Sequence, residues 1–517
     1  MSYNPGLSAA LLLSGILATG AATNPPPASQ ARLGINLSGC VDWSTEHPFV
    51  DVFRLSRPWI SQRQGAGWGK GSELERDANG WIKRLAPDCS AETPVFTAGH
   101  APSGEYVCLF EGEGELDFKP NRGVKAHAPG RIVVDLDGAK GGVFVQLKRT
   151  DPQNPIRNLR LLMPGGEPTA AQEPFSSAFL QRWRGFRAIR FMDWQETNDS
   201  HQREWAERPT LASCNFTGRG VPVEVMVDLC NRLQAEPWFC LPHLASDDYV
   251  RQFAALVKAR LDPVLRVYVE YSNEVWNSSF GQHRHAEEQG KRLGLGPADR
   301  PWEGAAHFYA RRSVEVFRLW EEAFGGRERL VRVIAWQAAG GEYWSDKMVL
   351  SFENTGRNCD VLAIAPYISV LPGPQSKPSS DEVAGWALEH LLDFTETNAL
   401  PACVGWMRTQ KQVADKHGLK LVCYEAGQHL VGVGGGENHE ALTKLMIAAN
   451  RHPRMGVFYS RYLDAWKSAG GDLCCLFSSV AQPSKWGSWG LLEAADEKNS
   501  PKFDAVMNWR TKNEPQK

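Results

Sequence analysis

Two carboxylates, each at the end of an apolar run, are the strongest chemical signal in the sequence. The segment "VYVEYSNEVWNSSF" (267–280) begins like a buried strand and passes directly into Asn273 and Glu274. A second apolar run, "LKLVCYEAG" (419–427), ends in Glu425. A strand that only stabilises a fold normally ends in glycine, proline or aspartate turn residues. One carboxyl that donates a proton and one that stays ionised form a pair suited to acid–base and nucleophilic catalysis.

Further polar and aromatic residues end other apolar runs. The runs are "FRAIRFMDW" from 186, "EPWFCLPH" from 236, "LVRVIAWQ" from 330 and "DVLAIAPYIS" from 360, and the segment "QPSKWGSWG" follows a last run. If these runs are parallel strands of one barrel, their carboxyl ends meet on one face, where barrel enzymes have their active sites. The residues that this arrangement brings to the two glutamates are Arg190, His243, Trp276, Trp336, Tyr367, Trp486 and Trp489.

Eight apolar, β-branched runs recur along the chain with amphipathic segments between them. The first is "LGINLS" from 33 and the last is "GDLCCLFSS" from 471. Near-continuous apolar strands that alternate with helices indicate a parallel sheet covered by helices, and eight such units predict a (β/α)₈ barrel. A doubly wound open sheet is the alternative, but no glycine-rich phosphate loop follows the first run.

The first two runs are separated by about 150 residues, far more than a strand–helix unit needs. Within this gap, short alternating strands separated by turn residues replace the helical period, which is typical of an antiparallel β-sandwich. We therefore predict a sandwich-like domain inserted after the first strand. The expected organisation is a signal peptide and proline-rich linker at 1–30, the barrel start at 31–83, the inserted β-domain at 84–165 and the rest of the barrel at 176–510.

The two glutamate segments resemble clan A of the glycoside hydrolases. "VEYSNE" is similar to the clan's Glu-x-x-Asn-Glu segment at the end of the fourth strand, and "YEAG" is similar to its nucleophile strand. The resemblance covers the barrel and not the inserted domain. It implies that Glu274 is the acid/base and Glu425 is the nucleophile.

The same resemblance implies roles for three neighbouring residues. Asn273 is the partner of the sugar 2-hydroxyl, Arg190 in "IRF" hydrogen-bonds the nucleophile, and Tyr367 matches the clan's aromatic hydroxyl. One departure is Val275, where many members have proline, so no family within the clan is assigned.

The residue types agree with this chemistry without the resemblance. Cleavage of a glycosidic bond needs one carboxyl to protonate the leaving oxygen and one carboxylate to meet the developing positive charge. We expect a retaining glycoside hydrolase that acts on a β-linked polysaccharide or oligosaccharide. A non-catalytic carbohydrate-binding barrel is the alternative, although a pure binder has no need of both glutamates.

Several of these residues also have purely structural interpretations. His243 is suited to capping a turn, and Trp276 and Trp336 are suited to a core position. Glu270 has the same side parity as Glu274, and we interpret it as a structural group paired with a basic residue inside the barrel. Asp42, Trp43, Asp193 and Trp194 follow the first two strands and would extend a sugar cleft, whereas Asp247 and Asp248 are typical of a helix N-cap.

The composition and net charge argue against some classes of binding partner. The net charge of −2 provides no basic field for nucleic acid, and no basic amphipathic helix indicates a membrane surface. The 19 tryptophans are interpreted either as core residues or as flat faces for sugar rings. No cysteine or histidine cluster has metal-ligand spacing, so we expect no metal and no cofactor. Cys89 and Cys108 flank a β-rich stretch and are a candidate disulfide pair.

The N-terminal 30 residues read as a targeting segment. An apolar run from Leu7 to Ala22 is followed by small residues and a proline-rich stretch, which resembles a secretory signal peptide. No lysine or arginine precedes the run, and an N-terminal anchor is the alternative. We expect a secreted or periplasmic protein.

Overall fold

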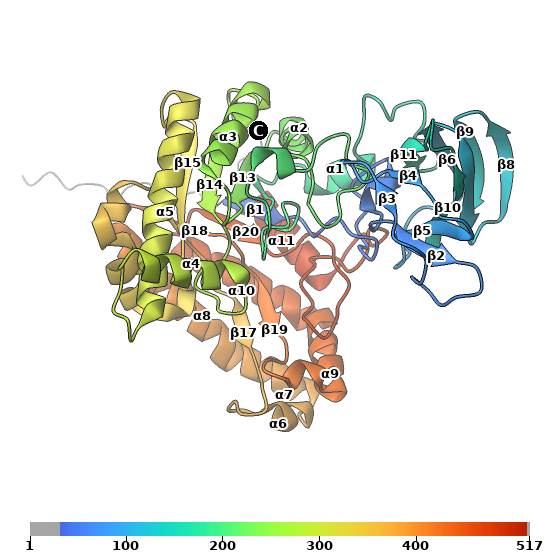
Figure 1. The fold of residues 1–517 in the computed structure, drawn as a ribbon. Coiled ribbons are helices and arrows are strands. Elements are labelled where there is room, and N and C mark those ends of the chain that lie inside the picture. Colours follow the sequence, from blue (N-terminus) through green and yellow to red (C-terminus); the bar gives the residue numbers. More distant parts are fainter. Residues whose placement is uncertain (1–31, 514–517) are drawn as a thin grey trace, which may run out of the picture.

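The eight expected apolar runs form a closed parallel barrel in the computed structural model, which describes residues 32–513 (Figure 1). β1 pairs with both β12 and β20, and this pairing closes the sheet. The predicted (β/α)₈ fold is therefore confirmed, and the doubly wound alternative is wrong. In order around the barrel, the strands are β1 (Arg32–Asn36), β12 (Ala188–Arg190), β13 (Glu236–Leu241), β14 (Val267–Tyr271), β15 (Leu330–Ala335), β16 (Val361–Ile364), β18 (Lys420–Cys423) and β20 (Leu473–Leu476).

Helices lie in the connections between these strands, except for α11, which follows the last strand. They are α1 (Ser177–Trp183), α2 (Val223–Leu233), α3 (Asp247–Arg260), α4 (Gly281–Arg292), α5 (Pro301–Phe324), α6 (Ser380–Ala384), α7 (Leu388–Phe394), α8 (Leu400–Lys416), α9 (Glu440–Arg451), α10 (Pro453–Ser468) and α11 (Pro501–Asn513). Short 3₁₀ turns are η1 (Val52–Leu55), η2 (Trp205–Glu207), η3 (Ala338–Gly340), η5 (Phe352–Arg357) and η7 (Gly436–Asn438), and π turns are η4 (Tyr343–Leu350) and η6 (Thr395–Ala399).

The start of α3 illustrates how the local sequence sets a helix boundary. The Ser246 hydroxyl accepts a hydrogen bond from the Tyr249 N–H at 3.2 Å, so Ser246 is the N-cap. Asp247 and Asp248, expected as the cap, occupy the first turn instead, where their charges favour the positive end of the helix.

The barrel interior is packed with side chains rather than open. Gly34 on β1 is required by this packing, because a Cβ atom there would lie 2.4 Å from the Cys475 Sγ atom of β20. The inward-facing residues include Ala188, Trp238, Cys240, Tyr268, Val333, Ala363, Val422, Tyr424 and Cys475. This filled interior supports the carboxyl ends of the strands from below.

The long connection after β1 folds into antiparallel sheets, drawn in blue and teal beside the barrel (Figure 1). One sheet has the order β2-β5-β10-β7 and the other has the order β11-β6-β9-β8. The strands are β2 (Ile60–Arg63), β5 (Cys89–Phe96), β6 (Gly104–Glu111), β7 (Gly114–Lys119), β8 (Gly123–Ala128), β9 (Arg131–Leu136), β10 (Val143–Thr150) and β11 (Arg157–Leu162). Two small two-stranded sheets pair β3 (Glu75–Arg76) with β4 (Ile82–Arg84), and β17 (Ile368–Val370) with β19 (Gln428–Leu430).

Residues 60–162, called the antiparallel unit below, have a hydrophobic core of their own. Side chains of both sheets meet in it, among them Val95, Tyr106, Val145 and Leu161. Because β2 pairs with β5, the antiparallel strands begin at Ile60, ahead of the start predicted at residue 84. The division into a barrel and an inserted domain at 84–165 stays a prediction.

Cys89 and Cys108 form no disulfide. Cys89 lies on β5 and Cys108 on β6, in different sheets, and all cysteines in the described part of the chain are free. Within residues 32–513, no helix combines the length and the apolar character needed to cross a bilayer. The expected signal peptide lies outside the described residues.

Candidate active site

The fourth barrel strand, β14, delivers Asn273 and Glu274 to the mouth of the barrel. The last ladder contact is from the Ser272 N–H to the Leu241 carbonyl at 2.8 Å, and the chain then turns sharply. Ser272 and Glu274 both have positive φ angles, 60° and 41°, which non-glycine residues rarely adopt. Such backbone costs on the order of 1–3 kcal/mol per residue and is concentrated at functional sites.

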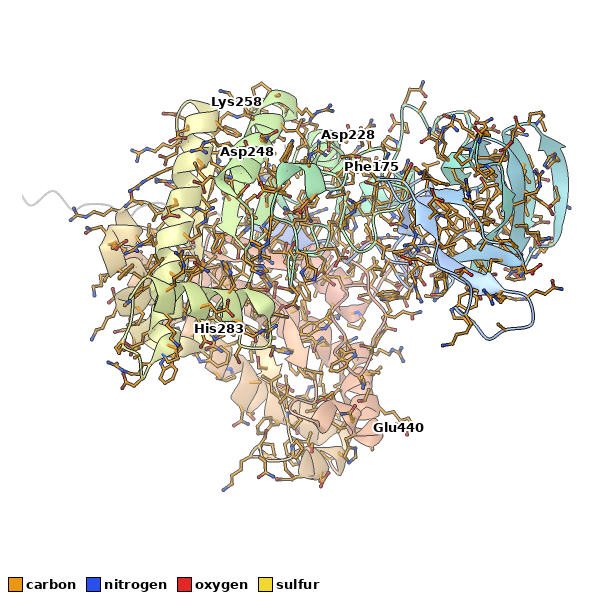
Figure 2. The ribbon with its side chains drawn as sticks, in the orientation of Figure 1. Phe175, Asp228, Asp248, Lys258, His283 and Glu440 are labelled. Atoms are coloured by element: carbon orange, nitrogen blue, oxygen red, sulfur yellow. The ribbon has the colours of Figure 1, made fainter. Side chains whose placement is uncertain are left out.

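Helix α4 supports this turn from behind. The Nδ1 atom of His283, labelled in Figure 2, lies 2.8 Å from the carbonyl oxygen of Val275, the residue after Glu274. The Gln282 side chain donates to the Asn273 carbonyl at 2.9 Å. Two neighbouring residues of one helix thus hold the backbone on both sides of Glu274.

Glu425 follows β18, the seventh barrel strand, and has two strong hydrogen-bond donors. The Arg190 Nη1 group donates to its Oε1 atom at 2.9 Å, and the Tyr367 hydroxyl donates to its Oε2 atom at 2.9 Å. Burial raises the pKa of Glu425 above its ordinary value, and the Arg190 charge and the Tyr367 hydrogen bond oppose that rise.

Arg190 uses all five of its N–H donors within the barrel mouth. Besides Glu425, it donates to Asn36 from Nη1 at 3.1 Å and to Asn273 from Nη2 at 2.8 Å. Its Nε and Nη2 groups donate to the Glu270 Oε2 atom at 3.2 and 3.0 Å. A fully bonded guanidinium has one orientation, so Arg190 fixes the relative positions of these groups.

Glu270 is therefore paired with a basic group inside the barrel, as its side parity indicated. It is buried and also accepts from the Trp238 indole N–H at 2.8 Å. Glu270 accepts two Arg190 N–H bonds, so it satisfies buried donors that Glu425, which accepts only one, leaves over.

Glu274 has only uncharged donors around its carboxyl group. The Tyr424 hydroxyl donates to Oε1 at 3.0 Å, and the Asn277 amide donates to Oε2 at 2.9 Å. Burial, followed by the nearby charge of Glu425, raises the pKa of Glu274 to about 7. Of the two carboxyls, Glu425 ionises first because only Glu425 touches a positive charge.

Asn273 lies between the arginine and the loop after β12. Its Oδ1 atom accepts from Arg190, and its Nδ2 group donates to the Asn198 side chain at 3.0 Å. The amide orientation is thus set by two polar contacts. An amide nitrogen has two hydrogens, so one remains for a ligand hydroxyl.

His243 and Trp486, two further predicted site residues, have neighbours other than these carboxyls. His243 follows β13 and packs edge-on against His285 of α4, with ring centroids 5.4 Å apart. Burial and His285 lower the pKa of His243 to about 4, so it is neutral at physiological pH. Trp486 is 61% exposed on the loop after β20 and lines a cleft beside the barrel mouth.

Trp276 and Trp336 pack against the core between the strands and helices. Trp336 stacks with Trp344, with ring centroids 6.0 Å apart, and its ring centroid lies 5.6 Å from that of Tyr309 on α5. Trp276 is half-buried, and its indole N–H has no hydrogen-bond partner among the described residues. Neither contact set includes Glu274 or Glu425.

The sequence reasoning missed several residues that contact Glu274, Arg190 or Asn273. They are Asn36, Asn198, Asn277 and Tyr424. Asn36 and Tyr424 had a usable signal, since each lies at the end of an apolar run and Tyr424 directly precedes Glu425. Asn277 follows Glu274 by three residues, whereas Asn198 lies in a long irregular loop that carries no pattern.

Asp193 is a further acidic group near Glu425. It follows β12, and burial together with the charge of Glu425 raises its pKa to about 7. Among residues 32–513, no group of three or more histidine, cysteine, aspartate or glutamate side chains is arranged to hold a metal ion.

Comparisons with known proteins find structures but no sequence relatives. No family model matches the chain, and no curated protein matches it. Solved structures that match include a Clostridium thermocellum endo-1,4-β-D-xylanase, with 10% identity over 90% of this chain and 97% of that chain and a TM-score of 0.38. A Fusarium oxysporum 4-O-α-L-rhamnosyl-β-D-glucuronidase matches with 10% identity over 66% of each chain and a TM-score of 0.40. A Thermotoga petrophila endo-β-1,4-mannanase matches with 12% identity over 66% of this chain and 74% of that chain and a TM-score of 0.35.

All three names are those of glycosidases, the class that the glutamate segments resemble. At these identities and TM-scores, the matches assign no family, substrate or catalytic residue to this chain.

Proposed function

We propose that the protein is a retaining glycoside hydrolase that cleaves β-linked bonds by double displacement, with Glu425 as the nucleophile and Glu274 as the acid/base. The observation that carries this proposal is the unequal surroundings of the two carboxyls. Glu425 contacts Arg190 and Tyr367, whereas Glu274 contacts only uncharged donors. Two carboxyls whose surroundings separate their proton affinities are what this chemistry requires.

In the first step, a Glu425 carboxylate oxygen attacks the anomeric carbon. The bond from that carbon to the leaving oxygen breaks, and Glu274 gives its proton to the leaving oxygen. The product is a glycosyl ester on Glu425. Tyr367 and Arg190 orient the attacking carboxylate and keep it ionised before the reaction.

In the second step, water attacks the anomeric carbon of the ester and gives a proton to Glu274. The ester bond breaks, and Glu425 returns as a carboxylate. Loss of the Glu425 charge during the ester stage lowers the pKa of Glu274, because that charge is one of the causes that raise it. Glu274 therefore acts as an acid first and as a base afterwards.

Asn273 stabilises the transition state in this scheme. Its remaining amide hydrogen donates to the sugar 2-hydroxyl, a contact that strengthens as positive charge develops at the neighbouring carbon. The fixed Arg190 and Asn198 contacts hold the amide in place before substrate arrives.

The test is covalent trapping. The protein is incubated with 2-deoxy-2-fluoro β-glycosides of gluco, manno, xylo and galacto configuration that carry a dinitrophenolate leaving group, and its peptides are analysed by mass spectrometry. We expect one of these sugars on the peptide containing Glu425, and no label in Glu425→Gln. Carbohydrate binding without labelling by any of the four would instead support the non-catalytic carbohydrate-binding barrel.

Export to the periplasm or the outside of the cell is part of the proposal. It rests on the apolar segment at 7–22. N-terminal sequencing of the protein recovered from the producing cells tests it, with cleavage after the small residues near 22 as the expected result.

A further inference from the structure

A cleft of about 570 Å³ opens beside the two carboxyls, and neither proposed catalytic step uses it. Its lining comes from the loops after β1, β12 and β20 and from the β5–β6 loop of the antiparallel unit. This volume lies in the range of ligand sites in proteins. Its lining residues include Trp43, Thr97, Ala98, Asp193, Trp486 and Trp489.

The cleft adjoins residues that neighbour the proposed nucleophile. Trp489 lines it and packs against Tyr367 with ring centroids 5.6 Å apart, and the Tyr367 hydroxyl donates to Glu425. Asp193 also lines it and lies close enough to Glu425 for the Glu425 charge to raise the pKa of Asp193. The cleft thus lies on the side of the reacting centre where Trp489 and Asp193 stand.

Two large aromatic side chains of the cleft are unusually exposed. Trp43 is 56% exposed on the loop after β1, and Trp486 is 61% exposed on the loop after β20. A basic group lies over each ring: the Arg57 guanidinium at 5.6 Å from the Trp43 centroid and the Lys485 ammonium at 4.7 Å from the Trp486 centroid. These contacts help to hold the rings in place while much of their apolar surface faces solvent.

The charged groups at the cleft are one lining carboxyl and the two basic groups over its exposed rings. Among its described lining residues, Asp193 is the only charged one, and the polar remainder consists of hydroxyls and one amide, including Ser44, Thr97 and Gln482. Acidic sugars are bound by free arginine or lysine side chains. Arg57 and Lys485 lie over the two exposed rings, but Arg57 is paired with the Asp42 carboxylate and Lys485 donates to the Asn438 side chain. Hydroxyl-rich surfaces beside flat apolar rings suit uncharged sugars.

The antiparallel unit supplies a fixed side of the cleft. The Thr97 N–H donates to the Asp42 carbonyl at 2.7 Å, and its hydroxyl lies 3.1 Å from the same oxygen. The Asp42 carboxylate is itself held by Arg57 through two hydrogen bonds of 2.9 and 2.8 Å. One aspartate after β1 thus connects the antiparallel unit to Arg57, which orients Trp43.

We propose that this cleft is a substrate subsite for a neutral glycan several sugar units long, with sugar rings stacked on Trp43 and Trp486 and with the antiparallel unit as one side. The inference rests on the proposed function, since it places the reacting sugar at Glu425. It assigns the antiparallel unit to the substrate cleft rather than to a separate binding surface. It also predicts that long neutral chains are better substrates than short glycosides.

Two measurements test the subsite. The first compares kcat/KM for an aryl β-glycoside, which fills little beyond the reacting centre, with kcat/KM for soluble polymers: mixed-linkage β-glucan, glucomannan, arabinoxylan and galactan. The second is affinity electrophoresis of Glu274→Gln in the same polymers and in polygalacturonate. In Trp43→Ala and Trp486→Ala, we expect the ratio of polymer to aryl-glycoside kcat/KM to fall about tenfold or more, which is about 1.4 kcal/mol.

Matched variants separate ring stacking from general damage. Trp43→Phe and Trp486→Phe keep a flat face and should retain most of the polymer preference. Trp302→Ala removes a tryptophan that is 45% exposed on α5, outside the cleft, and should change neither measurement. Thermal unfolding of each variant shows whether it is folded, which we expect because Trp43 and Trp486 are largely exposed.

The outcomes distinguish the subsite from the proposed function. Turnover with an unchanged ratio in both alanine variants would overturn the subsite and leave the proposed function standing. No turnover of any substrate, together with polymer binding that the alanine variants lose, would overturn the proposed function and leave the subsite standing. Binding of polygalacturonate in preference to every neutral polymer, or binding of none of these polymers, would also overturn the subsite.

Discussion

In the proposed mechanism, Glu425 acts as nucleophile and Glu274 as acid/base, so replacing each predicts a different stereochemical result. Glu425→Gly removes the attacking oxygen, so turnover should fall by several orders of magnitude. Added azide then attacks from the vacated side and gives a product of inverted configuration. In Glu274→Ala, a substrate with a good leaving group should still form the ester, and azide should release a product of retained configuration.

Nuclear magnetic resonance of the glycosyl azides distinguishes the two products. Swapped configurations would reverse the two roles. Full activity in either variant would remove this pair from the mechanism.

The separation of the two proton affinities predicts a bell-shaped pH profile. As pH rises through about 7, Glu274 loses the proton that the leaving oxygen needs, so kcat/KM should fall. On the acid side, kcat/KM should fall as Glu425 takes up a proton. The measurement is hydrolysis of an aryl β-glycoside with a poor leaving group. In Glu274→Ala, ester formation from a good leaving group should lose the alkaline limb, and a flat wild-type profile across about pH 6–9 would contradict the assignment.

Glu270 should tune the acid limb of that profile without touching substrate. Its charge is one of the causes that raise the pKa of Glu425, and both carboxylates share Arg190. Glu270→Gln keeps an oxygen for Arg190 but removes the charge, so the acid limb of kcat/KM should move to lower pH. A variant that lowers kcat at every pH equally would show that Glu270 only supports the fold.

At the scale of elements, another buried carboxyl, Glu46, connects the loops after β1 and β20 to α1. Glu46, after β1, accepts from the Trp183 indole of α1 at 2.8 Å and from the Ser479 hydroxyl after β20. Burial raises the pKa of Glu46 from 4.5 to about 7, against these two hydrogen bonds. The contacts between the loop after β1, helix α1 and the loop after β20 therefore depend on the protonation state of Glu46.

This carboxyl predicts a pH-dependent stability. Because the folded-state pKa lies above the unfolded value, the stabilisation is complete below about 4.5 and is lost as pH rises through about 7. Glu46→Gln preserves the shape and removes the titration. Between about pH 4.5 and pH 8, wild type should lose on the order of 3 kcal/mol of unfolding free energy relative to the variant.

Urea unfolding of both proteins at the two pH values measures this difference, and all other titrating groups cancel in the comparison. An offset between wild type and Glu46→Gln that is the same at both pH values would contradict the prediction.

At the scale of the whole molecule, the barrel and the antiparallel unit share one short turn. Phe53 of η1 is fully buried in the core of the antiparallel unit and stacks on Trp81, with ring centroids 6.0 Å apart. Phe53→Ala should reduce the unfolding free energy by about 3–5 kcal/mol. Because Thr97 of that unit lines the cleft, polymer binding should weaken as well.

Urea unfolding, followed by tryptophan fluorescence, measures the loss of unfolding free energy in Phe53→Ala. Val124→Ala, at a side chain 54% exposed on β8, is the control and should change stability by no more than about 0.5 kcal/mol. Polymer binding that survives full destabilisation of the unit would argue against its place in the cleft.

The sequence by itself determined the barrel and the edge where the polar residues gather. Each of the eight strands is a short apolar run that ends in a visible change of residue type, and both features are local. Parallel strands of a closed barrel end on one face, so Glu274, Glu425, Arg190 and Tyr367 could be brought together from their positions in the runs alone. The sandwich pattern was also local, although its first strand, β2, was missed because a four-residue strand carries little pattern.

Only the tertiary structure decided which side chains meet. Arg190 contacts Asn36 and Glu425, residues 154 and 235 positions away, and no local pattern encodes such pairs. Tryptophan type alone could not separate Trp336, which packs in the core, from Trp43, which lies exposed at the cleft. Thr97 of the antiparallel unit lines the cleft, and the local sequence around Thr97 does not show this either. Contacts between distant segments depend on how strands pair and how chains turn at their ends, and that information appears only when the whole chain is folded.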